Sequence, residues 1–124
     1  EDCNISGASA SGVVVNGGGE VALRRSVLCR CAQHGLHVHT RSIALVESCS
    51  FFENGSHGLA VEGARARCQV TKCMLSYNKG AGAAAEGGGE MAVEDNDLRN
   101  NEGGTHYVAQ ESHKLVRIGA NLTL

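Results

Sequence analysis

Proline and tryptophan are absent from this chain of 124 residues, and only two phenylalanines and two tyrosines are present. Aromatic side chains usually dominate the core of a globular domain, so a conventional globular core is not expected here. The apolar residues are mostly valine, leucine, alanine and cysteine, which suit a narrow and regular interior. The lack of proline also fits central β-strands, because each residue of such a strand must donate its backbone N–H to a neighbour.

Long apolar runs and a strong excess of one charge are missing as well. No apolar stretch approaches the about 20 residues that a membrane-spanning helix needs. The formal net charge is -2, which favours neither nucleic acid nor an anionic membrane surface as a partner. The sequence therefore predicts no membrane span and no nucleic-acid partner. It begins with Glu1 rather than methionine, and we expect residues 1–124 to form a single domain that is a fragment or module of a larger chain.

Glycine, by contrast, is abundant, and its 17 residues recur at regular intervals. The stretch GVVVNGGGEVAL (residues 12–23) returns as GAAAEGGGEMAV (residues 82–93). Equivalent glycines lie between the two at a nearly constant spacing, and either Gly104 or Thr105 comes next. The glycines that mark the repeat are Gly12, Gly35, Gly58 and Gly82. A period of about 23 residues with about five copies indicates stacked structural units.

Each copy of the repeat contains three pairs of apolar or small residues, with a spacing of two residues inside each pair. This spacing is typical of β-strands, so we predict three very short strands per copy, separated by turns. Copies stacked about 4.8 Å apart place each residue above its equivalent in the next copy. Two such inward columns are Cys3, Ser26, Cys49, Cys73 and Asn96, and Ile5, Leu28, Phe51, Leu75 and Leu98. After residue 108 the register is lost, and Val116 or Ile118 could continue an inner column.

A polar column lies at one of the predicted turns. It contains Cys31, Asn54, Asn78 and Asn101. A turn between inward-facing strands leaves backbone donors and acceptors partly buried, and asparagine side chains can bond these groups. We therefore expect an asparagine ladder that passes hydrogen bonds from one copy to the next.

The stretches VESCSFFENGSHGLAV (residues 46–61) and VTKCMLSYNKGAGAAA (residues 70–85) carry these columns most clearly. They resemble the parallel β-helix repeat of the pectate-lyase-like superfamily. The resemblance implies an all-β fold, a right-handed single-stranded parallel β-helix (solenoid), in which each of about five coils is one copy of the repeat. The superfamily includes polysaccharide lyases, hydrolases and epimerases, phage tail proteins and protein-binding domains. Because its members differ so widely, the resemblance implies the fold and leaves the activity open.

The six cysteines allow two interpretations. Cys3, Cys49, Cys68 and Cys73 fall in inward columns, where free thiols behave as small apolar residues. A disulfide between cysteines on adjacent coils remains the alternative, although stacked parallel side chains have poor geometry for it. The sequence favours buried free thiols, and free thiols slightly favour a reducing, intracellular location for the protein. Cys29 and Cys31 have no matching second pair, so we predict no zinc site there.

One outward face brings ionisable residues together: His37, His39, Glu62 and Glu86. This cluster is the candidate binding face, because such side chains could bind a cation or act as base and acid. Outward acids are nevertheless common on any β-helix, so the interpretation adopted is a solvated face, with no catalytic residue, no metal site and no cofactor predicted. His34 and His57 precede two of the marker glycines and are expected to stack as turn residues. The GGGE segments lack the P-loop pattern and are interpreted as tight turns.

Three functions are compatible with these observations. The first is a non-catalytic structural or protein-binding module, in which a protein partner or a neighbouring segment covers the open coil ends. The second is a carbohydrate-binding or polysaccharide-processing domain, with carbohydrate as the possible partner; only Phe52, Tyr77 and Tyr107 could stack on sugars. The third is a self-assembling fibre or trimer segment. The first is preferred because the scaffold is complete and no convincing catalytic set accompanies it.

Overall fold

The computed structural model describes residues 2–110, 116–119 and 121, and these residues form three parallel β-sheets. Sheet A contains β1 (Asn4–Ser6), β4 (Val27–Cys29), β7 (Ser50–Phe52) and β10 (Met74–Ser76). Sheet B contains β2 (Val13–Val15), β5 (Leu36–Val38), β8 (Leu59–Glu62), β11 (Ala83–Glu86) and β13 (His106–Val108). Sheet C contains β3 (Glu20–Arg24), β6 (Ile43–Glu47), β9 (Arg67–Thr71), β12 (Glu90–Glu94) and β14 (Val116–Ile118).

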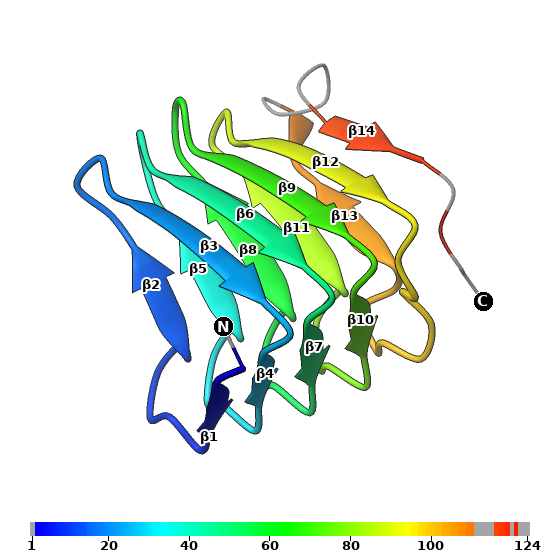
Figure 1. Ribbon diagram of the computed structural model, residues 1–124. Helices are drawn as coiled ribbons and strands as arrows, with labels where there is room; N and C mark the ends of the chain where they lie inside the picture. The colour runs from blue at the N-terminus through cyan, green and yellow to red at the C-terminus, as the bar shows by residue number, and fades with distance from the viewer. Residues whose placement is uncertain (1, 111–115, 120, 122–124) are drawn as a thin grey trace.

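Each of the first four coils contributes one strand to each sheet in turn, and the fifth contributes strands to sheets B and C and meets sheet A through a single bridge between Met74 and Asp97. The coils therefore stack as a solenoid (Figure 1). Neighbouring strands within a sheet are parallel and come from successive coils. Leu36 pairs with Leu59, and Leu59 with Ala83, which confirms the period predicted from the marker glycines. Ala83 pairs in turn with His106, so Thr105 rather than Gly104 is the equivalent of the marker glycines.

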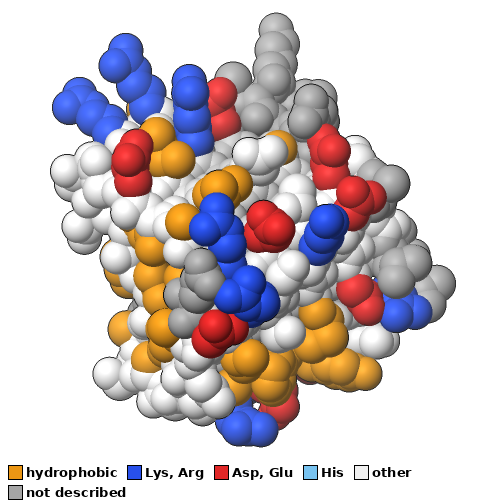
Figure 2. All heavy atoms as spheres, in the orientation of Figure 1, with side chains coloured by type: hydrophobic (Ala, Val, Ile, Leu, Met, Phe, Trp, Pro, Cys, Tyr) orange, Lys and Arg blue, Asp and Glu red, His pale blue; other side chains and the backbone are white. Residues whose placement is uncertain are grey.

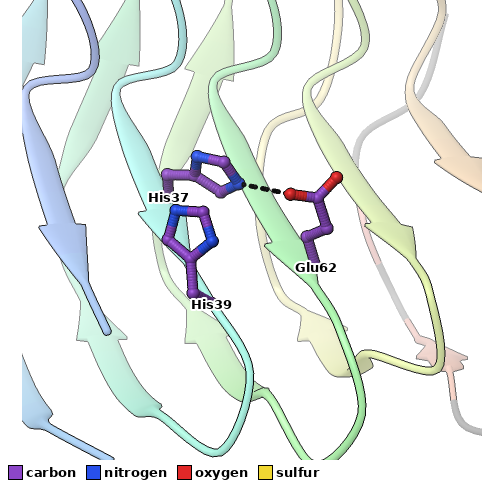
Figure 3. Close-up of side chains that lie close together, drawn as sticks. All are labelled: His37, His39 and Glu62. Atoms are coloured by element: carbon purple, nitrogen blue, oxygen red, sulfur yellow. Dashed lines mark hydrogen bonds and ion pairs between the residues drawn. The ribbon is translucent and has the colours of Figure 1, made fainter. Parts of the chain in front are cut away.

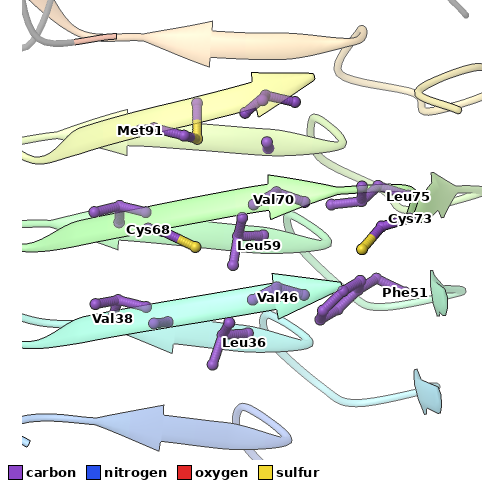
Figure 4. Packing of buried hydrophobic residues seen from close by; sticks show 14 of the residues in the cluster. Leu36, Val38, Val46, Phe51, Leu59, Cys68, Val70, Cys73, Leu75 and Met91 are labelled. Carbon is purple, nitrogen blue, oxygen red and sulfur yellow. The ribbon is translucent and has the colours of Figure 1, made fainter. Parts of the chain in front are cut away.

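The interior is filled by the predicted inward columns (Figure 4). Leu28, Phe51, Leu75 and Leu98 form one column, and each is fully buried. Ile5, the first member of the same column, is only partly buried, because no coil precedes it in the described structure. At the other end Met91 pairs with Val116 and Val93 with Ile118, and the partly buried Ile118 packs against the core, so it continues an inner column as predicted.

The asparagine ladder is present at the turn between sheets A and B. The Asn78 Nδ2 atom donates to the Phe51 carbonyl at 3.2 Å and to Asn101 Oδ1 at 2.9 Å. Asn78 Oδ1 accepts from both the backbone N and the Nδ2 of Asn54, at 3.2 and 2.9 Å. Asn54 Oδ1 accepts from the Cys31 backbone at 3.1 Å. Each buried amide therefore satisfies backbone groups that the turn removes from the strand ladders.

The cysteine column forms a second polar ladder. Cys49 donates its backbone N–H to Cys73 Sγ at 3.4 Å, and Cys73 donates its own to Asn96 Oδ1 at 2.8 Å. Asn96 donates to Asn121 Oδ1 at 2.9 Å, a continuation that the sequence analysis missed. Cys49, Cys68 and Cys73 are buried free thiols, as predicted; Cys29 and Cys31 are buried as well, and none of the six cysteines forms a disulfide. Cys3 is exposed, contrary to its inward assignment, because it lies at the end of the stack.

Glycine is required for two different reasons. A Cβ atom on Gly58 would lie 2.8 Å from the Gly82 carbonyl oxygen and 2.9 Å from Asn78 Nδ2, so the marker glycines allow close stacking beside the asparagine ladder. Gly87 and Gly88 have φ angles of 61° and 87° in the turn from β11 to β12, which confirms that the GGGE segments are tight turns. The described residues include no helix long and apolar enough to cross a membrane.

Replacing Asn78 with alanine tests the asparagine ladder. The substitution leaves the Asn54 backbone N–H and the Phe51 carbonyl without their partner in a buried environment, so we expect the free energy of unfolding to fall by about 2–4 kcal/mol. Urea unfolding followed by circular dichroism measures the change. Asn16→Ala is the control, because Asn16 is exposed and its loss should change stability by less than about 0.5 kcal/mol. Equal effects at the two positions would contradict a stabilising ladder.

Candidate functional site

The candidate face is the outer surface of sheet B. One outward row on this surface crosses all five strands, and its residues pair in register from coil to coil: Val14, His37, Ala60, Ala84 and Tyr107. The row has bulky side chains at its ends and two alanines in the middle, which makes the middle of the face lower than its ends. Glu62 and Glu86 pair in register beside the alanines.

His34 and His57 stack on the other side of the alanines. Their rings are 5.2 Å apart and nearly parallel, with an interplanar angle of 4°, as predicted for the column before the marker glycines. The Nδ1 atom of His34 accepts the backbone N–H of His57 at 3.2 Å, and the Nδ1 atom of His57 accepts that of Ala81 at 2.9 Å. Since each Nδ1 atom is an acceptor, both rings are held as neutral imidazoles with the proton on Nε2.

The remaining cluster residues contact one another directly. His37 packs edge-on against His34, with ring centroids 4.8 Å apart, and lies 3.9 Å from the ring of His39. Its Nε2 atom is 3.2 Å from Glu62 Oε1 (Figure 3). Thus residues from the β5 and β8 coils converge on one point of the outer face, and His37, His39 and Glu62 offer ligand atoms that all lie within 4.8 Å of one another.

A pocket of about 250 Å³ lies over the two alanines. Its wall includes His34, His37, His57, Glu62 and Glu86. Tyr107 is not part of the wall, but its ring lies 6.4 Å from that of His57 and is parallel to it within 2°. His39 borders Glu62 and His37 but does not line the pocket, so the four predicted residues divide between two parts of the face.

Burial keeps the histidines of the pocket uncharged. Burial, together with the nearby His37 and His57, lowers the pKa of His34 from 6.5 to about 4. Burial also lowers the pKa of His37 and of His57, while Glu62 opposes the shift at His37 and Glu86 opposes it at His57. With neutral imidazoles and two carboxylates, the pocket has a negative potential at neutral pH, which favours a cationic ligand.

Several acids on the other surfaces are paired with arginines. Figure 2 shows basic and acidic side chains interspersed over the face of sheet C, where Arg67 and Glu90 form an ion pair at 3.0 Å. Near sheet A, Arg25 pairs with Asp2 at 3.1 Å and Arg99 with Asp97 at 2.8 Å. Asp2, Glu90 and Asp97 are thus paired with arginines, whereas the described residues around Glu62 and Glu86 in the pocket include histidines and no lysine or arginine.

Sequence analysis found the acids and two of the histidines of this face. It treated His34 and His57 as turn residues only, although both are walls of the pocket. The sequence offers Tyr107 for sugar stacking, and the structure places it in the outward row that contains Ala60 and Ala84. The repeat itself contains the signal that places His34 and His57 here. Residues one position before and two positions after each marker glycine lie on the same outward face and border the same pocket.

The protein is therefore a parallel β-solenoid with a pocket lined by ionisable side chains on the outer face of sheet B. The sequence model of the right-handed β-helix region matches residues 1–118, and the chain belongs to this family. The solenoid is therefore right-handed, and its about five turns have the predicted period. No curated protein and no solved structure gives a significant match.

Acid should destabilise the protein through His34. The unfolded state takes up a proton near pH 6.5 and the folded state only near pH 4, so the unfolded state binds more protons between these values and stability falls as the pH drops. We expect a loss of about 1 kcal/mol between pH 7.5 and pH 5, after allowing for screening of a ring that is partly solvated. Urea midpoints at the two pH values measure it. His34→Gln should show a clearly smaller loss, and an unchanged pH dependence in that variant would refute the assignment.

Proposed function

We propose that the domain is a non-catalytic protein-binding module, and that the pocket on sheet B accepts a basic side chain of the partner. The observation that carries this proposal is the pair of carboxylates, Glu62 and Glu86, in register beside uncharged imidazoles. A lysine or arginine side chain placed there replaces part of its hydration shell with two acceptors. An arginine has the additional advantage of a planar fork that can engage carboxylates in two parallel hydrogen bonds.

The dimensions of the pocket support an arginine or lysine tip. Carboxylates on adjacent coils originate about 4.8 Å apart, which allows one cationic group to approach both. The floor at Ala60 and Ala84 is apolar and nearly fully buried, so it can contact the aliphatic stem of the side chain. Tyr107 is 48% exposed and offers an aromatic face near His57, which lines the pocket.

Rigidity of the face also supports a binding role. The strands that carry the pocket are hydrogen-bonded on both sides, since β8 pairs with β5 and β11. His34 and His57 are further held through hydrogen bonds with backbone N–H groups. A surface that is already ordered loses little conformational entropy on binding, which favours affinity for a partner.

The carbohydrate alternative has weaker support. Of the aromatics named for sugar stacking, Tyr107 lies on the candidate face, whereas Tyr77 follows β10 and Phe52 ends β7, both in the sheet A part of the coil. Asp2 and Asp97 are engaged by arginines away from the pocket. The self-assembly alternative draws on a different feature, the partly buried inner residues of the first coil, Ile5, Val13 and Val21.

Peptide binding tests the proposal. Twelve-residue peptides that differ only at a central arginine, lysine, citrulline or glutamate are titrated with the protein by fluorescence polarisation. Because a charge-assisted hydrogen bond contributes about 1.5–3 kcal/mol, we expect arginine or lysine to bind at least about tenfold more tightly than citrulline in the best sequence contexts. Glu86→Gln should remove most of this preference.

Glu90→Gln is the matched control, because Glu90 lies on the outer side of sheet C and forms an ion pair with Arg67. It should leave the arginine preference unchanged. A preference that survives Glu86→Gln, or equal binding of arginine and citrulline peptides, would overturn the proposal. Incubation with uronate oligomers checks the non-catalytic part, and cleaved or unsaturated products would contradict it.

A further inference from the structure

We propose that His37, His39 and Glu62 bind one divalent transition-metal ion of the Zn²⁺ class. This inference goes beyond the proposed function, because it concerns the His39 edge of the face and does not require a protein partner. It also departs from the sequence analysis, which predicted no metal site. Three protein ligands leave one coordination position for water or for a donor from a bound molecule.

The distances suit a tetrahedral ion. Zinc lies about 2.0–2.1 Å from imidazole nitrogen and carboxylate oxygen, so two ligand atoms of one tetrahedron are about 3.3 Å apart. His37 Nε2 and Glu62 Oε1 are already 3.2 Å apart. The third ligand atom, on His39, lies within 4.8 Å of both others, so a small side-chain rotation completes the set.

His39 has the freedom for that rotation. Its ring lies 3.9 Å from that of His37 at a tilt of 37°, and no hydrogen bond to the ring is found in the described part of the chain. The side chain follows the end of β5 and is only partly buried. Figure 3 shows the His39 ring beside His37, with both rings and the Glu62 carboxylate on the same side of the ribbon.

The backbone fixes the other two ligands. His37 is the central residue of β5, which pairs with β2 on one side and β8 on the other. Glu62 ends β8 and pairs with Glu86 of β11. Ligands on strands that are hydrogen-bonded on both sides keep their positions when the ion binds, so the ordering cost of assembling the site is small.

The donor set selects the class of ion. Two imidazoles and one carboxylate suit zinc, copper or nickel, whereas calcium and magnesium prefer oxygen ligands alone. Glu86 lies one coil away and adds negative charge without a ligand position in the cluster. The edge of His34 packs against His37 and supports its ring orientation.

Zinc titration by isothermal calorimetry tests the proposal, on the whole chain with Cys3→Ser in every sample so that the exposed thiol cannot bind the metal. We expect one equivalent of Zn²⁺ to bind. His39→Gln and Glu62→Gln should each weaken zinc binding by at least about 100-fold. Removing a residue that only supports a metal ligand weakens binding by up to about 100-fold, and the loss of a ligand itself should cost at least as much. The matched controls are His106→Gln and Glu86→Gln, which remove a histidine outside the cluster and a carboxylate one coil away, and each should weaken binding by less than about tenfold.

A second measurement uses protein in which His37, His39 and Glu62 are intact, so a folding defect in a variant cannot affect its result. Zinc should shift the ring nitrogen resonances of His37 and His39 in long-range ¹H–¹⁵N spectra and leave those of His106 in place. Shifts confined to other histidines, no saturable binding, or equal losses in test and control variants would each overturn the proposal. The metal site and the peptide pocket are separable: His39→Gln should weaken zinc binding by at least about 100-fold and retain the arginine preference, whereas Glu86→Gln should largely retain zinc binding and remove most of the arginine preference.

Discussion

Register between successive coils is the constraint on which the structure depends. The parallel ladders of three sheets hold each coil directly above the previous one, so each residue has its equivalent as a neighbour. A one-residue slip would reverse the inward and outward faces of every strand in a coil. It would place Leu28 and Phe51 at the surface and Glu62 inside. The buried leucine column and the asparagine ladder oppose that slip together, because each is satisfied in a single register.

The same stacking explains why this interior tolerates polar atoms. Asn78 is fully buried, yet its side chain has partners on the coils to either side and on the strand beneath it. Cys49 and Cys73 are bonded in the same manner through their backbone and sulfur atoms. Each coil supplies the groups that its neighbour lacks, so stability is distributed along the stack. The first coil lacks one neighbour in the described structure, and its Ile5 and Cys3 are correspondingly more exposed.

On the outer face, stacking brings together residues that are far apart in sequence. His37 and Glu62 are separated by 25 residues and interact at 3.2 Å. Their meeting could be predicted from the columns, because it follows from the register alone. The pocket could not, since its depth comes from the small side chains at Ala60 and Ala84 and from the conformations of the histidine and glutamate side chains around them. Those features depend on side-chain conformations, and a period does not specify them.

The sequence by itself determined the period, the three strands per coil, the inward columns and the identity of the acids and histidines on one face, because each is a property of spacing along the chain. Tertiary structure alone decided which side chains face the same pocket and which are neutral. The low pKa of His34 results from burial beside other histidines. The exposure of Cys3 and the inclusion of Asn121 in the cysteine column depend on where the stack ends. These outcomes arise from the surroundings of a residue in three dimensions, which a one-dimensional repeat does not contain.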